Sequence, residues 1–207
     1  ERRNATEDRT DLQRHIEESM SDTVKKEAER IIDQTWNEDE APAVQVLGME
    51  IFFSSRSCCG ALKMVKAVQG ITYGIDNNSV FVLLGHNGAG KTTTINALVG
   101  NLRPTNGDAY VFGHSCNTSM RTINQMMGVC PQHDILWEQL TGREHLELFA
   151  ALRGMPEESI EQHVNERIQD VNLVKAQNVE SGTYSGGMKR RLSIAIALLG
   201  DPQIVYL

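Results

Sequence analysis

Aromatic side chains, cysteine and long apolar runs are all scarce in this 207-residue sequence. Only 5% of the residues are aromatic, yet a hydrophobic content of 40% is enough for a domain of this length to bury a core. The four cysteines form no C-x-x-C spacing, and a domain of this size needs no disulfide, which favours a reduced, cytosolic setting. No run approaches the roughly 18 apolar residues of a membrane span, so we expect any membrane part to lie outside this sequence.

Positive charge is also in short supply. The formal net charge of −7 argues against a general nucleic-acid binder. Nearly all of the excess negative charge lies in residues 1–40, which also carry apolar residues at helical spacing: Leu12, Ile16, Met20 and Val24. We therefore expect residues 1–42 to be an acidic, partly helical linker. It is either a connector that packs on a neighbouring segment or a solvated acidic helix.

What the sequence does contain is glycine at an informative spacing. Residues 85–92 read Gly-His-Asn-Gly-Ala-Gly-Lys-Thr and fit the phosphate-loop pattern G-x-x-x-x-G-K-[ST] without a mismatch. We expect residues 79–84 to form a short buried strand and residues 91–99 a helix that Gly100 ends, which is the context this loop requires. Such a loop presents successive N–H groups as a concave anion site, and the helix adds its positive dipole end. The alternative is a glycine-rich turn before an ordinary helix.

Individual residues of the loop have expected roles. Lys91 should reach the β and γ phosphates, the Thr92 hydroxyl should be a ligand of Mg²⁺, and Thr93 should donate a further hydrogen bond. A GTPase is disfavoured because the sequence has neither a D-x-x-G nor an N-K-x-D segment. The predicted nucleotide-binding residues of the loop are Gly85, His86, Asn87, Gly88, Ala89, Gly90, Lys91, Thr92 and Thr93.

Strands are expected on both sides of the loop. Residues 44–53 and 64–75 should form two strands joined by a loop at 54–60, and Phe52 lies about thirty residues before the loop, where its ring could stack on a purine or simply belong to the core. After the loop helix we expect a strand at 109–112, a helix at 121–127 and a strand at 128–131. The last strand delivers Gln132 at its carboxyl end, where ligands gather in open α/β sheets.

The C-terminal third reads as helical. Thr141 and Glu144 predict a capping box at the start of one helix, and Pro156 opens a second that runs to about residue 172. We expect His145 and His163 to be surface residues on these helices.

A second glycine motif follows a polar loop at residues 178–183. Ser185 should cap an apolar helix over residues 192–199, and Gly186 and Gly187 expose backbone N–H groups at its start. This is either a second phosphate-binding device or an ordinary glycine-rich cap. Residues 203–207 should form a final buried strand.

The order of these motifs resembles the nucleotide-binding domain of ATP-binding cassette (ABC) transporters, over about residues 44–207. The resemblance rests on residues 85–92, on Gln132 as a Gln-loop residue, and on Ser185-Gly186-Gly187-Met188 where the family has its signature S-G-G-Q. The wording is similar to the A subfamily, whose members are largely lipid exporters in eukaryotic membranes. Tyr184 departs from the family's usual leucine, and Met188 from its usual glutamine.

The resemblance implies an α/β fold: a P-loop NTPase (RecA-like) core with an antiparallel β portion over residues 43–207, and an α-helical subdomain at about 134–200. It implies ATP and Mg²⁺ as cofactors, with Lys91 and Gln132 in catalysis and Thr92 and Gln132 at the metal. It also implies that two such domains clamp ATP between the phosphate loop of one and Ser185, Gly186 and Gly187 of the other.

The same resemblance implies ATP hydrolysis coupled to the movement of a lipid-like substrate by transmembrane domains outside this sequence, at the cytosolic face of a membrane. Residues 204–207 match the family's Walker B strand, whose acidic end lies beyond the sequence. We therefore expect a fold truncated before its end, which binds ATP but hydrolyses it poorly or not at all. Two alternatives stay open: a soluble ABC ATPase without a transport role, and a non-hydrolysing regulatory module.

Overall fold

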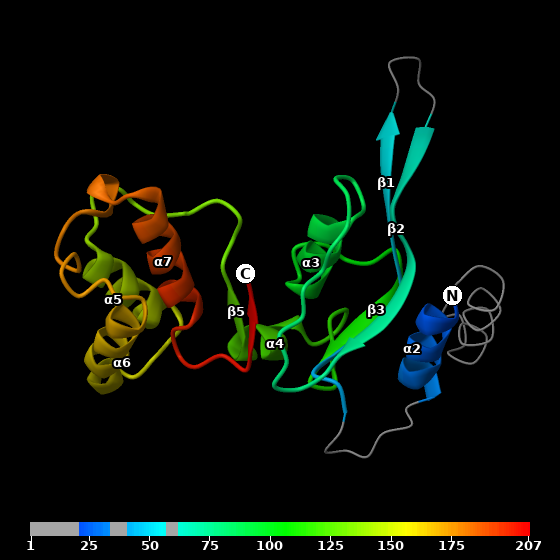
Figure 1. Cartoon of the computed structure of the whole chain (residues 1–207), viewed down its shortest axis with the longest axis horizontal. Helices are drawn as coiled ribbons and strands as arrows, with labels where there is room; N and C mark the ends of the chain where they lie inside the picture. Colours follow the sequence, from blue (N-terminus) through cyan, green and yellow to red (C-terminus); the bar gives the residue numbers. More distant parts are fainter. Residues whose placement is uncertain (1–20, 34–40, 57–61) are drawn as a thin grey trace. The chain divides into compact units, whose positions relative to one another are not determined.

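The structure is a computed structural model that describes residues 21–33, 41–56 and 62–207 (Figure 1). The chain divides into two compact units, Glu1–Met120 and Arg121–Leu207, which we describe one at a time. Within the described ranges, no helix has the length and apolar character needed to cross a membrane.

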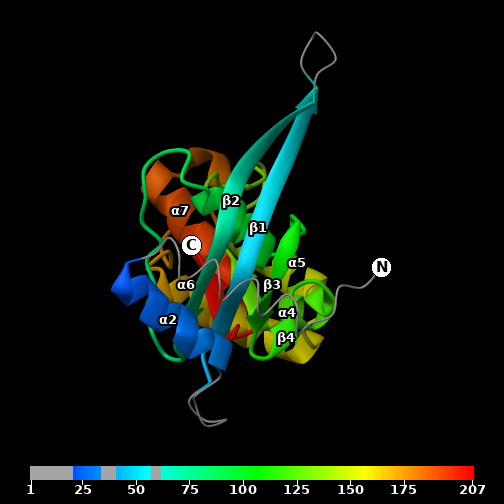
Figure 2. The same cartoon turned by 90° about the vertical axis from the view of Figure 1, so that its right-hand side faces the viewer.

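The first unit is built on an antiparallel sheet in the order β2-β1-β3-β4. β1 (Val44–Arg56) and β2 (Leu62–Ile75) form a long hairpin, while β3 (Asn106–Val111) pairs with β1 and β4 (His114–Ser115) with β3 (Figure 2). Alternate residues of β1 face the core, so Val44 and Val46 are fully buried. Met49 is also fully buried, because the register shifts between Val46 and Met49. The two predicted strands are confirmed; β1 extends into the segment predicted as a loop at 54–60, and β2 begins two residues earlier than predicted. Residues 57–60 of that segment lie outside the described part.

An N-terminal helix, α2 (Asp22–Asp33), packs on this sheet. Ala28 and Ile31 are fully buried, whereas Val24 is 42% exposed. α2 therefore packs on a neighbouring segment through Ala28 and Ile31, as the packed alternative expects, whereas Val24 of the predicted stripe is exposed. The other apolar positions of the predicted stripe, Leu12, Ile16 and Met20, lie outside the described residues.

The strand predicted at residues 79–84 is wrong. These residues belong to neither sheet of the described structure, and Val80 and Leu84 are 95% and 83% exposed. Their apolar run fitted a buried strand, but a strand also requires a neighbour to complete its backbone hydrogen bonds, and local sequence does not supply one. The helix that follows the loop is confirmed as α3 (Lys91–Leu98), and Gly100 ends it with a φ of +79°.

The second unit combines a short parallel pair of strands with packed helices. After α4 (Met120–Met126), β5 (Met127–Val129) pairs with β6 (Ile204–Tyr206), so the predicted final strand is present, though half-buried rather than buried. The helices are α5 (Gly142–Leu152), α6 (Glu157–Asp170) and α7 (Gly186–Ala197), with a short 3₁₀ turn, η2 (Ser181–Thr183). They share a core that includes Leu146, Val164, Leu192 and Leu199.

Hydrogen bonds at the helix ends hold these helices together. The predicted capping box is confirmed, because Thr141 accepts from the Glu144 N–H while Glu144 accepts from the Thr141 N–H. At the opposite ends, Arg191 donates to the carbonyls that follow α6, at Val171 and Asn172, and Arg153 donates to the carbonyl of Leu199 after α7. These carbonyls lack intrahelical partners, so the arginines satisfy them and fix each helix against the next.

His145 is not a surface residue, contrary to the prediction. Its side chain is fully buried: Nε2 accepts from the N–H of Trp137 at 2.9 Å, and Nδ1 donates to the carbonyl of Thr141 at 2.8 Å. Backbone groups replace water as hydrogen-bond partners of both ring nitrogens, so burial leaves neither nitrogen unsatisfied. His163 is half-buried, with Nδ1 donating to the carbonyl of Ser159.

Candidate nucleotide site

Two of the three glycines in the predicted phosphate loop of the first unit have left-handed backbone angles, and Gly85 does not. Gly88 and Gly90 have φ angles of +85° and +89°, which favour glycine. Gly90 is also the N-cap of α3, and no side chain caps that helix start. The first-turn N–H groups of α3 therefore have no side-chain acceptor, and they point out of a helix start whose dipole attracts anions.

Lys91 lies across the mouth of this loop. Its Nζ donates to the carbonyls of Gly85 at 2.7 Å and His86 at 2.9 Å, while the backbone of Ala89 closes the loop by donating to His86. The ammonium group is thus held over the exposed residues 85–89 by two backbone oxygens. A point charge placed there is suited to a phosphate group.

The residues of the loop fit a magnesium-bound nucleoside triphosphate. A Cβ at Gly88 would meet nothing within 4 Å, so the loop is open on that side, whereas a Cβ at Gly90 would lie 2.4 Å from the carbonyl oxygen of Ala67. Thr92 is exposed and Thr93 half-buried on the first turn of α3. A single hydroxyl ligand suits Mg²⁺, which keeps waters and takes phosphate oxygens as its other ligands.

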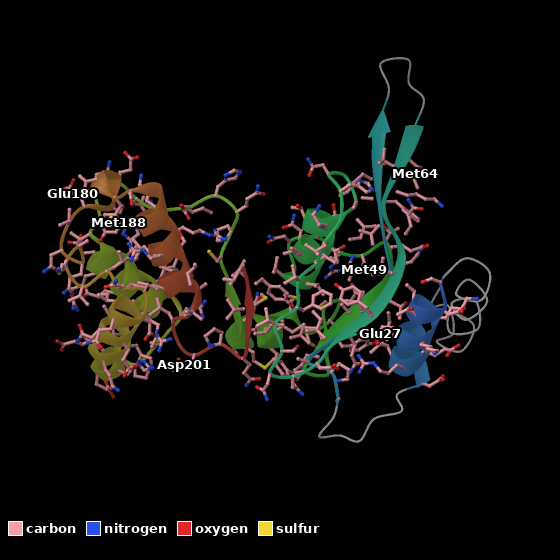
Figure 3. The ribbon with its side chains drawn as sticks, in the orientation of Figure 1. Glu27, Met49, Met64, Glu180, Met188 and Asp201 are labelled. Atoms are coloured by element: carbon pink, nitrogen blue, oxygen red, sulfur yellow. The ribbon has the colours of Figure 1, made fainter. Side chains whose placement is uncertain are left out.

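The second glycine motif starts α7 as predicted, and α7 includes both of its glycines. The Oγ of Ser185 accepts from the N–H of Met188, labelled in Figure 3, at 3.3 Å. Gly186 and Gly187 are exposed, and a Cβ at either would meet nothing within 4 Å. Tyr184, just before the cap, is buried and donates to the carbonyl of Ala176.

Comparison with known proteins shows the family. The profile described as ABC transporter matches residues 68–207. The chain belongs to the ABC transporter family. It is 46% identical over 176 residues to ABC transporter A family member 2 of Arabidopsis thaliana, covering 82% of this chain and 18% of that protein. It is also 46% identical over 145 residues to ABC transporter A family member 1 of Dictyostelium discoideum, covering 70% of this chain and 16% of that protein. The chain thus spans less than a fifth of these relatives.

Solved structures support the predicted fold class. An ATP binding subunit of an ABC transporter is 25% identical with a TM-score of 0.64, covering 79% of this chain and 64% of that one. An ATP-binding cassette solved as a dimer in a post-hydrolysis state, bound to ADP and Pi, is 22% identical with a TM-score of 0.68, covering 78% and 72%. The P-loop NTPase fold, with an antiparallel portion and helices, is therefore confirmed.

Helix α7 also holds the loop that carries Gln132. Gln132 is exposed, just past β5 in the second unit. The residues on either side of it are tied down, because Arg190 donates to the carbonyl of Pro131 and the Ser193 hydroxyl donates to Asp134 at 2.8 Å. Burial raises the pKa of the neighbouring Cys130 thiol, with Asp134 adding to the rise and Arg190 opposing it. Gln132 and Ser185 thus belong to one packed unit.

Sequence reasoning missed the two residues of α7 that hold this loop, Arg190 and Ser193. A signal was present, because the run Lys189-Arg190-Arg191 sits in the first turns of α7, where the helix dipole disfavours cations. Cations placed there need partners of their own. The structure supplies these partners. The Nζ of Lys189 lies 3.9 Å from Oε1 of Glu138, Arg190 donates to the carbonyl of Pro131, and Arg191 donates to the carbonyl at the end of α6.

Phe52, the predicted purine-stacking residue, is half-buried on β1. The Nζ of Lys66 on β2 lies 5.4 Å from its ring centroid, a cation–π contact on the surface of the hairpin. Among the described residues, no group of three or more His, Cys, Asp or Glu could hold a metal ion.

Proposed function

We propose that this chain is the nucleotide-binding module of a membrane transporter of the A subfamily and that it binds Mg-ATP at the phosphate loop. The observation that carries the proposal is Lys91 held across the open loop at the uncapped start of α3. Support comes from the relatives named ABC transporter A family members and from the cassette bound to ADP and Pi. In the proposal, hydrolysis drives the movement of a substrate, lipid-like by the resemblance to the A subfamily alone, through membrane domains outside these residues.

The chemistry assigned to each residue follows from its position. Lys91 exchanges its two carbonyl partners for β and γ phosphate oxygens, and the α3 amides donate to the same anion. Thr92 holds Mg²⁺, which supplies charge neutralisation on the phosphates when bound. Gln132 is assigned contact with the γ phosphate or the metal by its match to the family's Gln-loop residue.

Titration of the chain with different nucleotides tests binding. We expect ATP with Mg²⁺ to bind more tightly than AMP by at least roughly a hundred-fold, because AMP lacks the two phosphates that Lys91 contacts. Equal affinity for ATP and AMP, or no binding of either, would overturn the assignment. The prediction that these 207 residues alone release phosphate slowly stays a prediction, and a phosphate-release assay on the same sample tests it.

We also propose that Ser185, Gly186 and Gly187 face a nucleotide held by a second such domain. The exposure of all three and the open space around both glycines support this role. Ser185→Arg, made in a polypeptide that extends past Leu207, should block the close approach by bulk and charge. ATP binding to one subunit should persist while ATP-dependent pairing and turnover are lost. If both survive, the helix-cap interpretation of the motif is correct.

Phe52 is proposed to stack on the purine. Phe52→Ala should weaken ATP binding while leaving the affinity for inorganic triphosphate unchanged, because triphosphate has no base. An equal loss for both ligands would show that Phe52 acts through the fold. The neighbouring exposed Phe53, changed to alanine, is the matched control.

Of the two alternatives, a soluble ATPase is disfavoured by the A-family names of the relatives. A non-hydrolysing module is tested by phosphate release from the polypeptide that extends past Leu207. Transport itself is tested by reconstituting that polypeptide in vesicles with labelled lipid and asking whether lipid moves only when ATP is present. Turnover without lipid movement would favour the soluble ATPase.

A further inference from the structure

The N-terminal helix α2 forms side-chain hydrogen bonds with the C-terminal end of the edge strand β2 and the residue after it. Glu27, labelled in Figure 3, accepts the backbone N–H of Gly74 at 2.9 Å, and Arg30 donates to Asp76 at 3.0 Å. Among the described residues β2 is an edge of its sheet, so this outward N–H faces no neighbouring strand there, and the Glu27 carboxylate accepts from it instead. The fit is close, because a Cβ at Gly74 would lie 2.4 Å from Cδ1 of Ile31.

An ion pair between Arg30 and Glu27 holds these contacts in place at neutral pH. The guanidinium of Arg30 donates to both carboxylate oxygens of Glu27, from Nε and Nη2, at 2.9 Å each. This bonding lowers the pKa of Glu27 and raises the pKa of Arg30, against the burial that opposes both charges. The bidentate pair therefore fixes the carboxylate that reaches Gly74.

The same strand contacts the phosphate loop and the segment leading into it. The carbonyl oxygen of Ala67 lies 2.4 Å from where a Cβ of Gly90 would be, so the last glycine of the loop rests on β2. The Tyr73 ring stacks on Phe81 with centroids 5.4 Å apart and planes 5° from parallel, and burial raises the pKa of Tyr73 to about 12. Asp76 begins the segment that runs into the loop, and its carbonyl accepts from the Ser79 hydroxyl.

We propose that α2 is a clamp that positions the phosphate loop through β2, with Glu27 and Arg30 as positioning residues. The proposal rests on the proposed binding of nucleotide by that loop. α2 precedes the residues that match the family profile, so the match assigns it no role. All the contacts between α2 and the phosphate loop lie within the first unit. α2 is hydrogen-bonded to Gly74 and Asp76, and β2 contacts Phe81 and Gly90.

Coupling of this kind is reciprocal, which gives a test on the unaltered chain. If the clamp favours the loop shape that binds nucleotide, then nucleotide must in turn favour the clamp. Mg-ATP should slow hydrogen exchange of the Gly74 amide by about five-fold, a size typical of coupled sites. Lys91→Ala, with Mg-ATP present, should show no such slowing. Unchanged exchange at Gly74 when the wild-type loop is saturated with Mg-ATP would overturn the proposal.

Substitutions on α2 test whether the clamp affects the phosphate loop. Glu27→Ala should raise the Mg-ATP Kd by about five-fold and speed amide exchange over residues 85–91 without nucleotide. Arg30→Lys, which keeps the charge beside Glu27, should retain most of the wild-type affinity. Glu29→Ala is the matched control, because Glu29 is an exposed carboxylate on the same helix and should behave as wild type.

Melting temperatures separate a clamp from simple packing. If Glu27→Ala lowers the melting temperature yet leaves the Kd and the exchange of residues 85–91 unchanged, α2 is structural only and the proposal is wrong. Should Glu27→Ala not fold, the Gly74 measurement on the wild-type chain decides the matter. If the wild-type chain binds no Mg-ATP, the proposed function is wrong. Amide exchange of residues 85–91 in Glu27→Ala then still shows whether α2 positions the loop.

Discussion

The two glycine-containing helix starts, at α3 and at α7, differ in how their first-turn amides are treated. At α3 the N-cap is Gly90 in the left-handed region, and no side chain accepts from the helix. At α7 the N-cap is Ser185 in an extended conformation, and its hydroxyl accepts from Met188. The first-turn N–H groups of α3 therefore have no side-chain acceptor, whereas one of the first-turn N–H groups of α7 is already hydrogen-bonded to Ser185.

This difference separates two kinds of anion site. At α3 the loop backbone curves around the helix start and Lys91 adds a charge, so one unit by itself supplies a concave site. At α7 the glycines are exposed, and a Cβ at either would meet nothing within 4 Å. Such a surface suits a phosphate that another element already holds. Each of the following predictions tests this contrast, beginning with the largest expected effect.

Lys91→Ala should have the largest effect. Removing the ammonium takes away the main counter-ion of the phosphates, so we expect Mg-ATP binding to weaken by about 3 kcal/mol, roughly a hundred-fold. Equilibrium titration of folded wild type and variant measures it. Lys175→Ala, at an exposed lysine of the second unit, is the control and should bind as wild type. Equal dissociation constants for Lys91→Ala and wild type would remove the phosphate-loop assignment.

Glycine-to-alanine substitutions at the two helix starts should differ strongly. Gly90→Ala places a Cβ against the Ala67 carbonyl at a positive φ, so we expect a loss of about 2 kcal/mol in unfolding free energy. Gly187→Ala meets open space in a helical turn and should change the unfolding free energy by about 0.5 kcal/mol or less. Denaturant melts of the two variants give both numbers. Similar losses at the two positions would contradict the contrast.

Ser185→Ala should cost about 1 kcal/mol of stability, because the Met188 N–H loses its acceptor at the N-cap. Affinity of one subunit for Mg-ATP should not change. Ser185→Asn, which supplies another capping oxygen, should restore most of the stability. The measurement is urea denaturation, and an unchanged midpoint in Ser185→Ala would show that the cap contributes nothing.

The start of α5 offers a third case, with the smallest expected effect. Hydrogen bonds from the Thr141 backbone and hydroxyl lower the pKa of Glu144 below the ordinary value of a glutamate. A lowered folded-state pKa adds stability that is present above pH 4.5 and is lost as pH falls through the folded value. Thermal melts between pH 7 and about 3 should therefore fall less steeply for Glu144→Gln than for wild type. Parallel curves would contradict the capping contribution.

Much of the local structure could be predicted from sequence because its causes are local. The capping box at Thr141, the stop at Gly100, the cap at Ser185 and the phosphate loop each depend on a few neighbouring residues and on backbone angles that glycine permits. The order of these motifs also indicated the family, which the comparisons then showed. The roles given to the individual site residues remain predictions.

Only the tertiary structure decided which apolar and polar side chains are buried. Residues 79–84 carry a strand-like pattern yet lie exposed, since backbone pairing needs a neighbour that is distant in sequence. His145 is buried because the backbone of Trp137 and Thr141 meets both ring nitrogens, and Glu27 reaches Gly74 from 47 positions away. Short-range patterns encode backbone angles and caps, whereas burial and pairing depend on partners that only the folded chain brings together.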